Sequence, residues 1–115
     1  MPDVVRETLG TQPWEAGPEA EYGPVEDVPV AELAWLLDLP LWGSGGRPFQ
    51  VTPNQVAADR RRFAGHFARV MWADLEDPIR LDERNGRLVV LDGYHRLLKA
   101  VVEGRQTIRA VRRHK

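Results

Sequence analysis

The sequence contains no cysteine, and this absence excludes whole classes of site. Without thiols the chain can form no disulfide framework, no thiolate metal site and no cysteine nucleophile. It also lacks any run of 18 consecutive apolar residues, so we expect no membrane span. The few histidines, His66, His95 and His114, follow no metal-ligand spacing. The N-terminus is acidic where a secretory signal would be basic and then apolar, which predicts a cytoplasmic protein.

Net charge is small, at −1, but the balance of acids and bases changes along the chain. Residues 1–28 contain seven acids and one base, a balance of −6, which leaves +5 for the remaining 87 residues. A modestly basic body suits an anionic ligand. The bias is too weak to argue for duplex DNA by itself, so nucleic acid stays open as a partner without being favoured.

The length of 115 residues and the apolar fraction of 43% predict one globular domain with a single core. Residues 1–24 are acidic, rich in proline and glycine, and without apolar periodicity. This composition predicts a flexible arm, in which only the side chains of Trp14 and Tyr22 would pack against the folded domain. Residues 25–115 are expected to form the folded domain.

The first half of this domain carries local signals of moderate strength. The expected elements are a strand at 28–30, a helical turn at 31–37, a flexible loop at 43–46, a helix starting at Thr52 and a longer helix over 60–73. Thr52 and Gln55 form a capping box around Pro53, which suits the first helical position. Arg60, Arg61 and Arg62 would spread around the longer helix, either solvated beside local acids or as anion contacts.

The second half carries stronger signals. Two alternating strands, 79–84 and 87–91, flank Asn85-Gly86, which is a strong signal for a hairpin turn. The remaining elements are a helix over 94–103, a left-handed stop at Gly104 and a last strand over 107–111. Together these elements predict an α/β domain of the α+β kind, with helices packed on a sheet.

The junction between the second strand of this hairpin and the following helix is the candidate site. The first N–H groups of a helix have no internal partner and lie at the positive end of its dipole. Gly93 would let an oxyanion approach the backbone closely. His95 and Arg96 add two cationic side chains at the positive end of the helix, where cations are unfavourable unless an anion is bound. The turn is therefore predicted to bind phosphate. The alternative is structural: Asp92 caps the helix and pairs with Arg96.

The same residues carry a family resemblance. The segment from Val90 to Ala100 is VLDGYHRLLKA, followed by Gly104 and Thr107-Ile108. Together with the preceding hairpin and the opening Val28-Pro29-Val30, it resembles the ParB/sulfiredoxin-like superfamily over about residues 26–113. The resemblance implies a mixed sheet and a strand–turn–helix site in which a Gly-x-His-Arg turn binds nucleotide phosphates.

Departures from the family pattern narrow the expected activity. Sulfiredoxins carry a catalytic cysteine where this sequence has Tyr94, so repair of sulfinic acid is excluded. The arginine-rich box and helix-turn-helix of the chromosome-partition branch are not found in this sequence. The motif is most similar to Asp-Gly-His-His-Arg of the free serine kinase branch, where a glutamate activates the substrate hydroxyl. Glu32 and Asp38 are the candidates for that role here.

We therefore expect a nucleotide-binding domain, acting as a small ATP-dependent phosphotransferase or as a nucleotide hydrolase. The residues expected to bind the nucleotide are Gly93, Tyr94, His95, Arg96 and Lys99. Asp92 and His95 are the expected catalytic residues, with Asp92 serving as base or as a ligand of Mg²⁺. Residues 43–46 would fold over the nucleotide, and a small hydroxyl compound would be the acceptor. The alternative is a non-catalytic regulatory module that binds nucleotide or nucleic acid, supported by the basic tail at 112–115.

Overall fold

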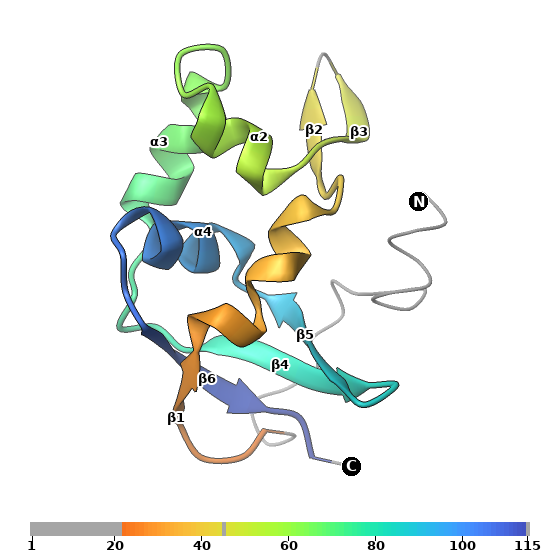
Figure 1. Ribbon diagram of the computed structural model, residues 1–115, viewed down its shortest axis with the longest axis vertical. Helices are drawn as coiled ribbons and strands as arrows, with labels where there is room; N and C mark the ends of the chain where they lie inside the picture. Colours follow the sequence, from red (N-terminus) through yellow and green to blue (C-terminus); the bar gives the residue numbers. More distant parts are fainter. Residues whose placement is uncertain (1–21, 45, 115) are drawn as a thin grey trace.

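The computed structural model describes residues 22–44 and 46–114, which form a mixed α+β domain (Figure 1). The main sheet has four strands in the order β1-β6-β4-β5: β1 (Glu26–Pro29), β6 (Thr107–Arg112), β4 (Ile79–Arg84) and β5 (Arg87–Asp92). The β4–β6 pair is parallel and the other two pairs are antiparallel, so the sheet is mixed. Of the predicted arm at 1–24, residues 1–21, with Trp14, lie outside the described residues.

The β4–β5 hairpin and the helix that follows it confirm the local signals of the second half. Asn85 and Gly86 both have positive φ, 53° and 76°, as a two-residue hairpin turn requires. Helix α4 (Tyr94–Val102) follows β5 after a single residue and returns the chain to β6. At its end Gly104 has the left-handed φ of 71° that was expected of a helix stop.

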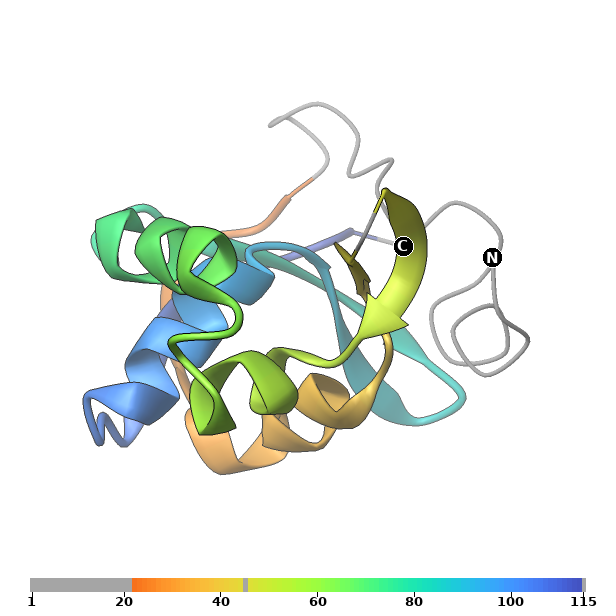
Figure 2. The same ribbon diagram turned by 90° about the horizontal axis from the view of Figure 1, so that it is seen from above.

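The helices cover one face of this sheet (Figures 1 and 2). They are two 3₁₀ helices, η2 (Val30–Glu32) and η3 (Ala34–Asp38), and the α-helices α2 (Pro53–Ala58), α3 (Ala64–Trp72) and α4. Fully buried aliphatic side chains from the sheet and from these helices form the core: Val28, Leu33, Leu36, Leu37, Val56, Val70, Ile79, Leu81, Leu97 and Leu98. At α2 the predicted capping box is confirmed, with Thr52 and Gln55 each bonding the other's backbone N–H.

The opposite face of the sheet carries a smaller cluster of Tyr22, Leu91 and Val111. Tyr22 is buried and forms an isolated antiparallel bridge with Arg113, and the Arg80 guanidinium lies 5.2 Å from its ring centre. The Gly23 N–H donates to the Arg112 carbonyl at 2.8 Å. Residues 22 and 23, whose composition placed them in the arm, therefore lie against the sheet.

Two elements of the first half differ from the prediction. Gly43 and Ser44 belong to strand β2 (Trp42–Ser44), which pairs with β3 (Arg47–Val51), so the expected flexible loop is wrong at these positions. A Cβ at Gly43 would lie 2.9 Å from the Arg47 carbonyl oxygen, so the glycine permits this pairing. The long helix begins at Ala64 and not at Arg60, because Asp59 accepts the Arg62 N–H and holds 60–63 in a turn.

Strand β1 and the turn after it also shift from the expected bounds. The strand ends at Pro29, and Val30 already begins η2. The expected helical turn at 31–37 is present as two short 3₁₀ helices. Among the described residues, no helix is both long enough and apolar enough to cross a bilayer.

Candidate functional site

The turn between β5 and α4 is shaped by packing against β4. Gly93 has a φ of 121°, and a Cβ built on it would lie 2.4 Å from Cγ2 of Ile79. No side chain fits between the turn and β4, which explains the glycine without reference to a ligand. The N-terminus of α4 has no side-chain cap, so the predicted alternative of Asp92 as a helix cap is wrong. Its first internal bond runs from the Leu97 N–H to the Gly93 carbonyl at 2.9 Å.

Arg96 fastens this turn to the start of β4. Its Nη1 donates to the carbonyl oxygens of Asp77 and Pro78 at 2.8 and 2.7 Å, and its Nη2 contacts Oδ2 of Asp92 at 3.2 Å. The Arg96 side chain is only 13% exposed, whereas that of Asp92 is 56% exposed. The predicted alternative of an Arg96–Asp92 pair is therefore present. The same guanidinium also binds the two backbone carbonyl groups that directly precede β4.

The side chains of Lys99 and Tyr94 also make contacts that stabilise the fold. The Lys99 Nζ donates to the carbonyl of Ala73 at 2.7 Å, which satisfies an oxygen at the C-terminal end of α3. Tyr94 packs against the core, and its buried hydroxyl has no hydrogen-bond partner among the described residues. Burial raises the pKa of Tyr94 well above its ordinary value, so the hydroxyl stays protonated.

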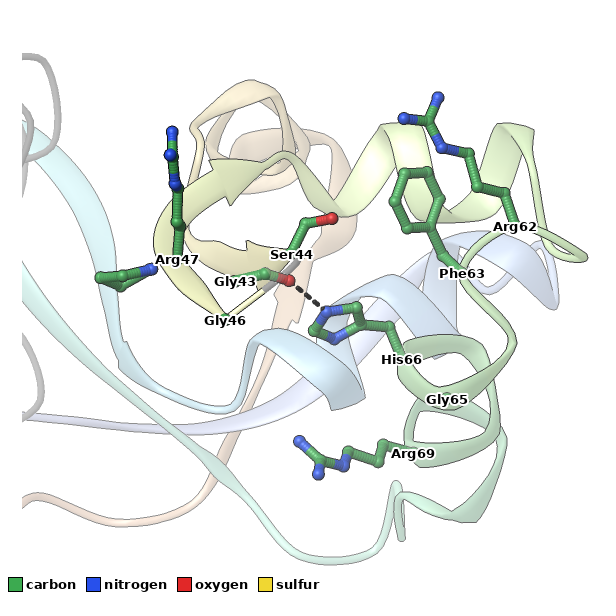
Figure 3. A pocket seen from close by; sticks show the side chains of 10 residues that line it. Gly43, Ser44, Gly46, Arg47, Arg62, Phe63, Gly65, His66 and Arg69 are labelled. Atoms are coloured by element: carbon green, nitrogen blue, oxygen red, sulfur yellow. Dashed lines mark hydrogen bonds between the residues drawn. The ribbon is translucent and has the colours of Figure 1, made fainter.

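His95 belongs to a stack of three rings with Trp42 and His66. Trp42 packs against His95 with ring centres 4.6 Å apart, and the far side of Trp42 packs against His66 at 5.3 Å. The His66 Nε2–H donates to the Gly43 carbonyl at 2.7 Å (Figure 3). The Nε2 atom of His95 is buried and has no partner within the described part of the chain. Burial, aided by Arg69, lowers the pKa of His95.

A cationic pocket of about 590 Å³ lies beside this stack, between the β2–β3 hairpin and the start of α3 (Figure 3). Four basic side chains line it: Arg47 from β3, Arg62 from the turn, and His66 and Arg69 from α3. The other lining residues are Gly43, Ser44, Gly46, Pro48, Phe63 and Gly65. None of the described lining residues is acidic. This arrangement concentrates positive charge around a cavity wide enough for a small molecule.

A second pocket of about 420 Å³ shares Ser44, Arg62 and Phe63 with the first. Its lining is polar, with Gln50, Gln55 and Asp59, and Asp59 is the one acid among the described residues that line either pocket. The two pockets therefore form adjoining cationic and polar halves, with the Phe63 ring at their boundary.

The residues predicted from the motif do not meet in one cavity. Only His95 lies next to the cationic pocket, through Trp42. Asp92 and Arg96 line a separate pocket of about 180 Å³. The predicted loop at 43–46 does contribute, because Gly43, Ser44 and Gly46 line the cationic pocket.

The sequence does not single out Arg47, Phe63, His66 or Arg69 as site residues. One signal was available: His66 and Arg69 follow the i, i+3 spacing that places side chains on one face of a helix. Arg47 approaches them only through the tertiary structure.

Asp92, the predicted Mg²⁺ ligand, is already paired with a cation. Its Oδ2 contacts Nη2 of Arg96 at 3.2 Å. Across residues 22–44 and 46–114, no group of three or more histidine, aspartate or glutamate side chains could hold a metal ion.

Comparison of the chain with family models, with curated proteins and with solved structures finds no match.

Proposed function

We propose that this domain binds a nucleotide, ATP first among the candidates, by holding its phosphate groups in the cationic pocket. The observation that carries the proposal is that four basic residues, Arg47, Arg62, His66 and Arg69, line a cavity of about 590 Å³ without an acid among its described lining residues. Uncompensated arginines around a concave site favour an anion, and their planar guanidinium groups match phosphate oxygens in a bidentate geometry.

The glycines of the pocket favour the same kind of ligand. Gly43, Gly46 and Gly65 leave the backbone of the hairpin and of α3 open to close approach. The adjoining polar pocket, with the Phe63 ring and the carboxamides of Gln50 and Gln55, would receive the nucleoside. Aromatic faces stack on any base and amide groups bond its edges, so the two halves match the two parts of a nucleotide.

The family resemblance supports the proposal from the sequence side. We propose that the β4–β5–α4 unit is the strand–turn–helix core of a ParB/sulfiredoxin-like domain. Its strand–turn–helix order and short turn agree with that pattern. In this proposal the phosphates lie in the cationic pocket, which Trp42 connects to His95 at the start of α4, and Arg96 acts by holding the turn in place.

Phosphoryl transfer to a small hydroxyl acceptor, or hydrolysis of the nucleotide, is the proposed activity. Such chemistry needs positioned cations and a group that orients the nucleophile. Arg69 and its neighbours would supply the cations. Asp92 is turned toward Arg96, so Asp59, in the adjoining pocket, is better placed than Asp92 to contact an acceptor hydroxyl. The proposed activity does not depend on a Mg²⁺ ion bound at Asp92.

A non-catalytic nucleotide-binding module is the second candidate. It is favoured by contacts that predicted site residues make within the fold: the predicted catalytic residue Asp92 pairs with Arg96, and the predicted binding residue Lys99 bonds the Ala73 carbonyl. Both candidate functions require the same binding site. A measurement of catalytic turnover of the nucleotide distinguishes them.

Isothermal titration calorimetry of the full chain with ATP, ADP, CTP and GTP at low salt tests the proposal. Arg69→Ala should weaken binding about tenfold to a hundredfold, the equivalent of one charge-assisted hydrogen bond of about 1.5–3 kcal/mol. Arg105→Ala removes the same charge at an exposed position outside the cationic pocket and should leave affinity nearly unchanged. Equal affinities for the wild type and Arg69→Ala, or no binding of any nucleotide, would overturn the proposal.

A further inference from the structure

Three aromatic rings from three separate elements connect the cationic pocket to the start of α4. Trp42 of β2 lies between His66 of α3 and His95 of α4, with interplanar angles of only 9° and 16°. His66 also lines the pocket, and its bond to the Gly43 carbonyl fixes its ring beside the hairpin (Figure 3). A change of charge in the pocket therefore acts on His95 over a short path through packed side chains.

Charged groups on three elements face His95. Helix α3 brings His66 and Arg69, α4 brings Arg96, and the end of β5 brings Asp92, whereas β2 brings the uncharged Trp42 ring. Burial has the largest effect on its pKa, and the three basic groups add to it, so the pKa of His95 is lowered despite Asp92. In the protein without ligand, the imidazole is therefore neutral at neutral pH.

A bound dianion would offset the part of this shift that the basic groups cause. His66 and Arg69, which oppose a charge on His95, also line the pocket in which the ligand would lie. An anion between them offsets their positive potential, and nearby negative charge favours the protonated form of a histidine. The Trp42 face, 4.6 Å away, also attracts an imidazolium through its ring electrons.

We infer that His95 takes up a proton when the cationic pocket binds a dianionic ligand such as a phosphate group. The inference rests on the proposed function, because it requires this pocket to be the anion site. It adds a property that phosphate binding alone does not require, namely that occupancy of the site depends on proton concentration.

The sign of the pH dependence follows from the linkage between the two equilibria. Above the pKa of His95 in the complex no proton is taken up, and affinity is at its lower plateau. As pH falls to the pKa of His95 in the free protein, affinity rises, and below it affinity is constant. A difference of about one pKa unit between the two states makes the acidic plateau about tenfold tighter.

Side-chain NMR titration of the full chain, with sulfate as the probe, tests this inference. Sulfate stays a dianion throughout the range from about pH 5 to 8, so its own charge does not change with pH. The chain has three histidines, which makes their assignment direct. With sulfate at saturation and ionic strength held constant, we expect the midpoint of His95 to rise by about one unit. His114, which lies beside Gly23, is the internal control.

The variant His95→Asn supplies a second readout. It removes this titrating ring and leaves His66 in the pocket, so the change in its sulfate affinity across the pH range should be about tenfold smaller than in the wild type. If sulfate shifts the amide signals of the pocket glycines but leaves the His95 midpoint unchanged, the inference is wrong and the anion site stands. If sulfate and nucleotides shift no pocket signal, the proposed function fails as well.

Discussion

Replacement of Gly93 by alanine should destabilise the domain through two separate effects. The backbone at this position has φ of 121°, a conformation that costs a residue with a Cβ about 1–3 kcal/mol. The added Cβ would also lie 2.4 Å from Cγ2 and 2.8 Å from Cβ of Ile79, which must move within a fully buried environment. Overpacking of this kind costs about 1–3 kcal/mol. The expected loss is therefore about 2–6 kcal/mol, a large fraction of the stability of about 5–15 kcal/mol typical of a domain.

Urea denaturation followed by circular dichroism measures this loss, and Gly104→Ala is the matched control. Gly104 also has a left-handed φ, 71°, but a Cβ there meets no atom within 4 Å. The control should therefore lose only the backbone contribution. If Gly93→Ala costs no more than Gly104→Ala, contact with Ile79 is not the reason for the glycine. A valine at position 93 would make the same contact. Loss of ligand binding in Gly93→Val would therefore reflect loss of folding, and would not show that a ligand approaches the backbone there.

Three further predictions follow from side chains around α4. Arg96→Ala should lower the free energy of unfolding by about 1.5–3 kcal/mol, because it leaves the carbonyls of Asp77 and Pro78 without a charged donor; a urea midpoint equal to that of Arg105→Ala would contradict this. Asp92→Asn should cost under about 1 kcal/mol, since the Asp92 side chain is 56% exposed, and should leave nucleotide affinity in calorimetry within twofold; a hundredfold loss of turnover would instead restore Asp92 as a catalytic residue. Because the pKa of His95 is lowered on folding, the unfolded chain binds its proton first as pH falls below about 6.5. Stability should therefore decline from that pH down to the folded pKa, and a decline of the same size in His95→Asn would refute the assignment.

Local signals in the sequence determined most of the second half of the fold. Asn85-Gly86 defines its hairpin because two adjacent positions with positive φ suit asparagine and glycine. The apolar spacing of α4 and the stop at Gly104 act within one or two turns of helix. The Thr52–Gln55 capping box is likewise a contact between residues three positions apart. Such features depend on neighbours in the sequence, so the pattern of residue types is enough to predict them.

The candidate site was predictable only in part, because its contacts join distant segments. The sequence placed a glycine, a histidine and an arginine at the start of α4, but it could not show where each side chain points. Ile79 explains Gly93, the carbonyls of residues 77 and 78 occupy Arg96, and Trp42 covers His95. In each case the partner lies at least fourteen positions away, and the three residues face different surroundings.

The sequence by itself determined the order of strands and helices from β4 onward, the capped start of α2 and the presence of basic groups at the start of α4. Only the tertiary structure decided which basic groups share a cavity. Arg47 on the hairpin lines the same cavity as His66 and Arg69 on α3, because His66 bonds the Gly43 carbonyl and stacks on Trp42, both of strand β2. Charge attracts a ligand according to distance in space, and the spacing of residues along the chain sets that distance only within a single helix or hairpin.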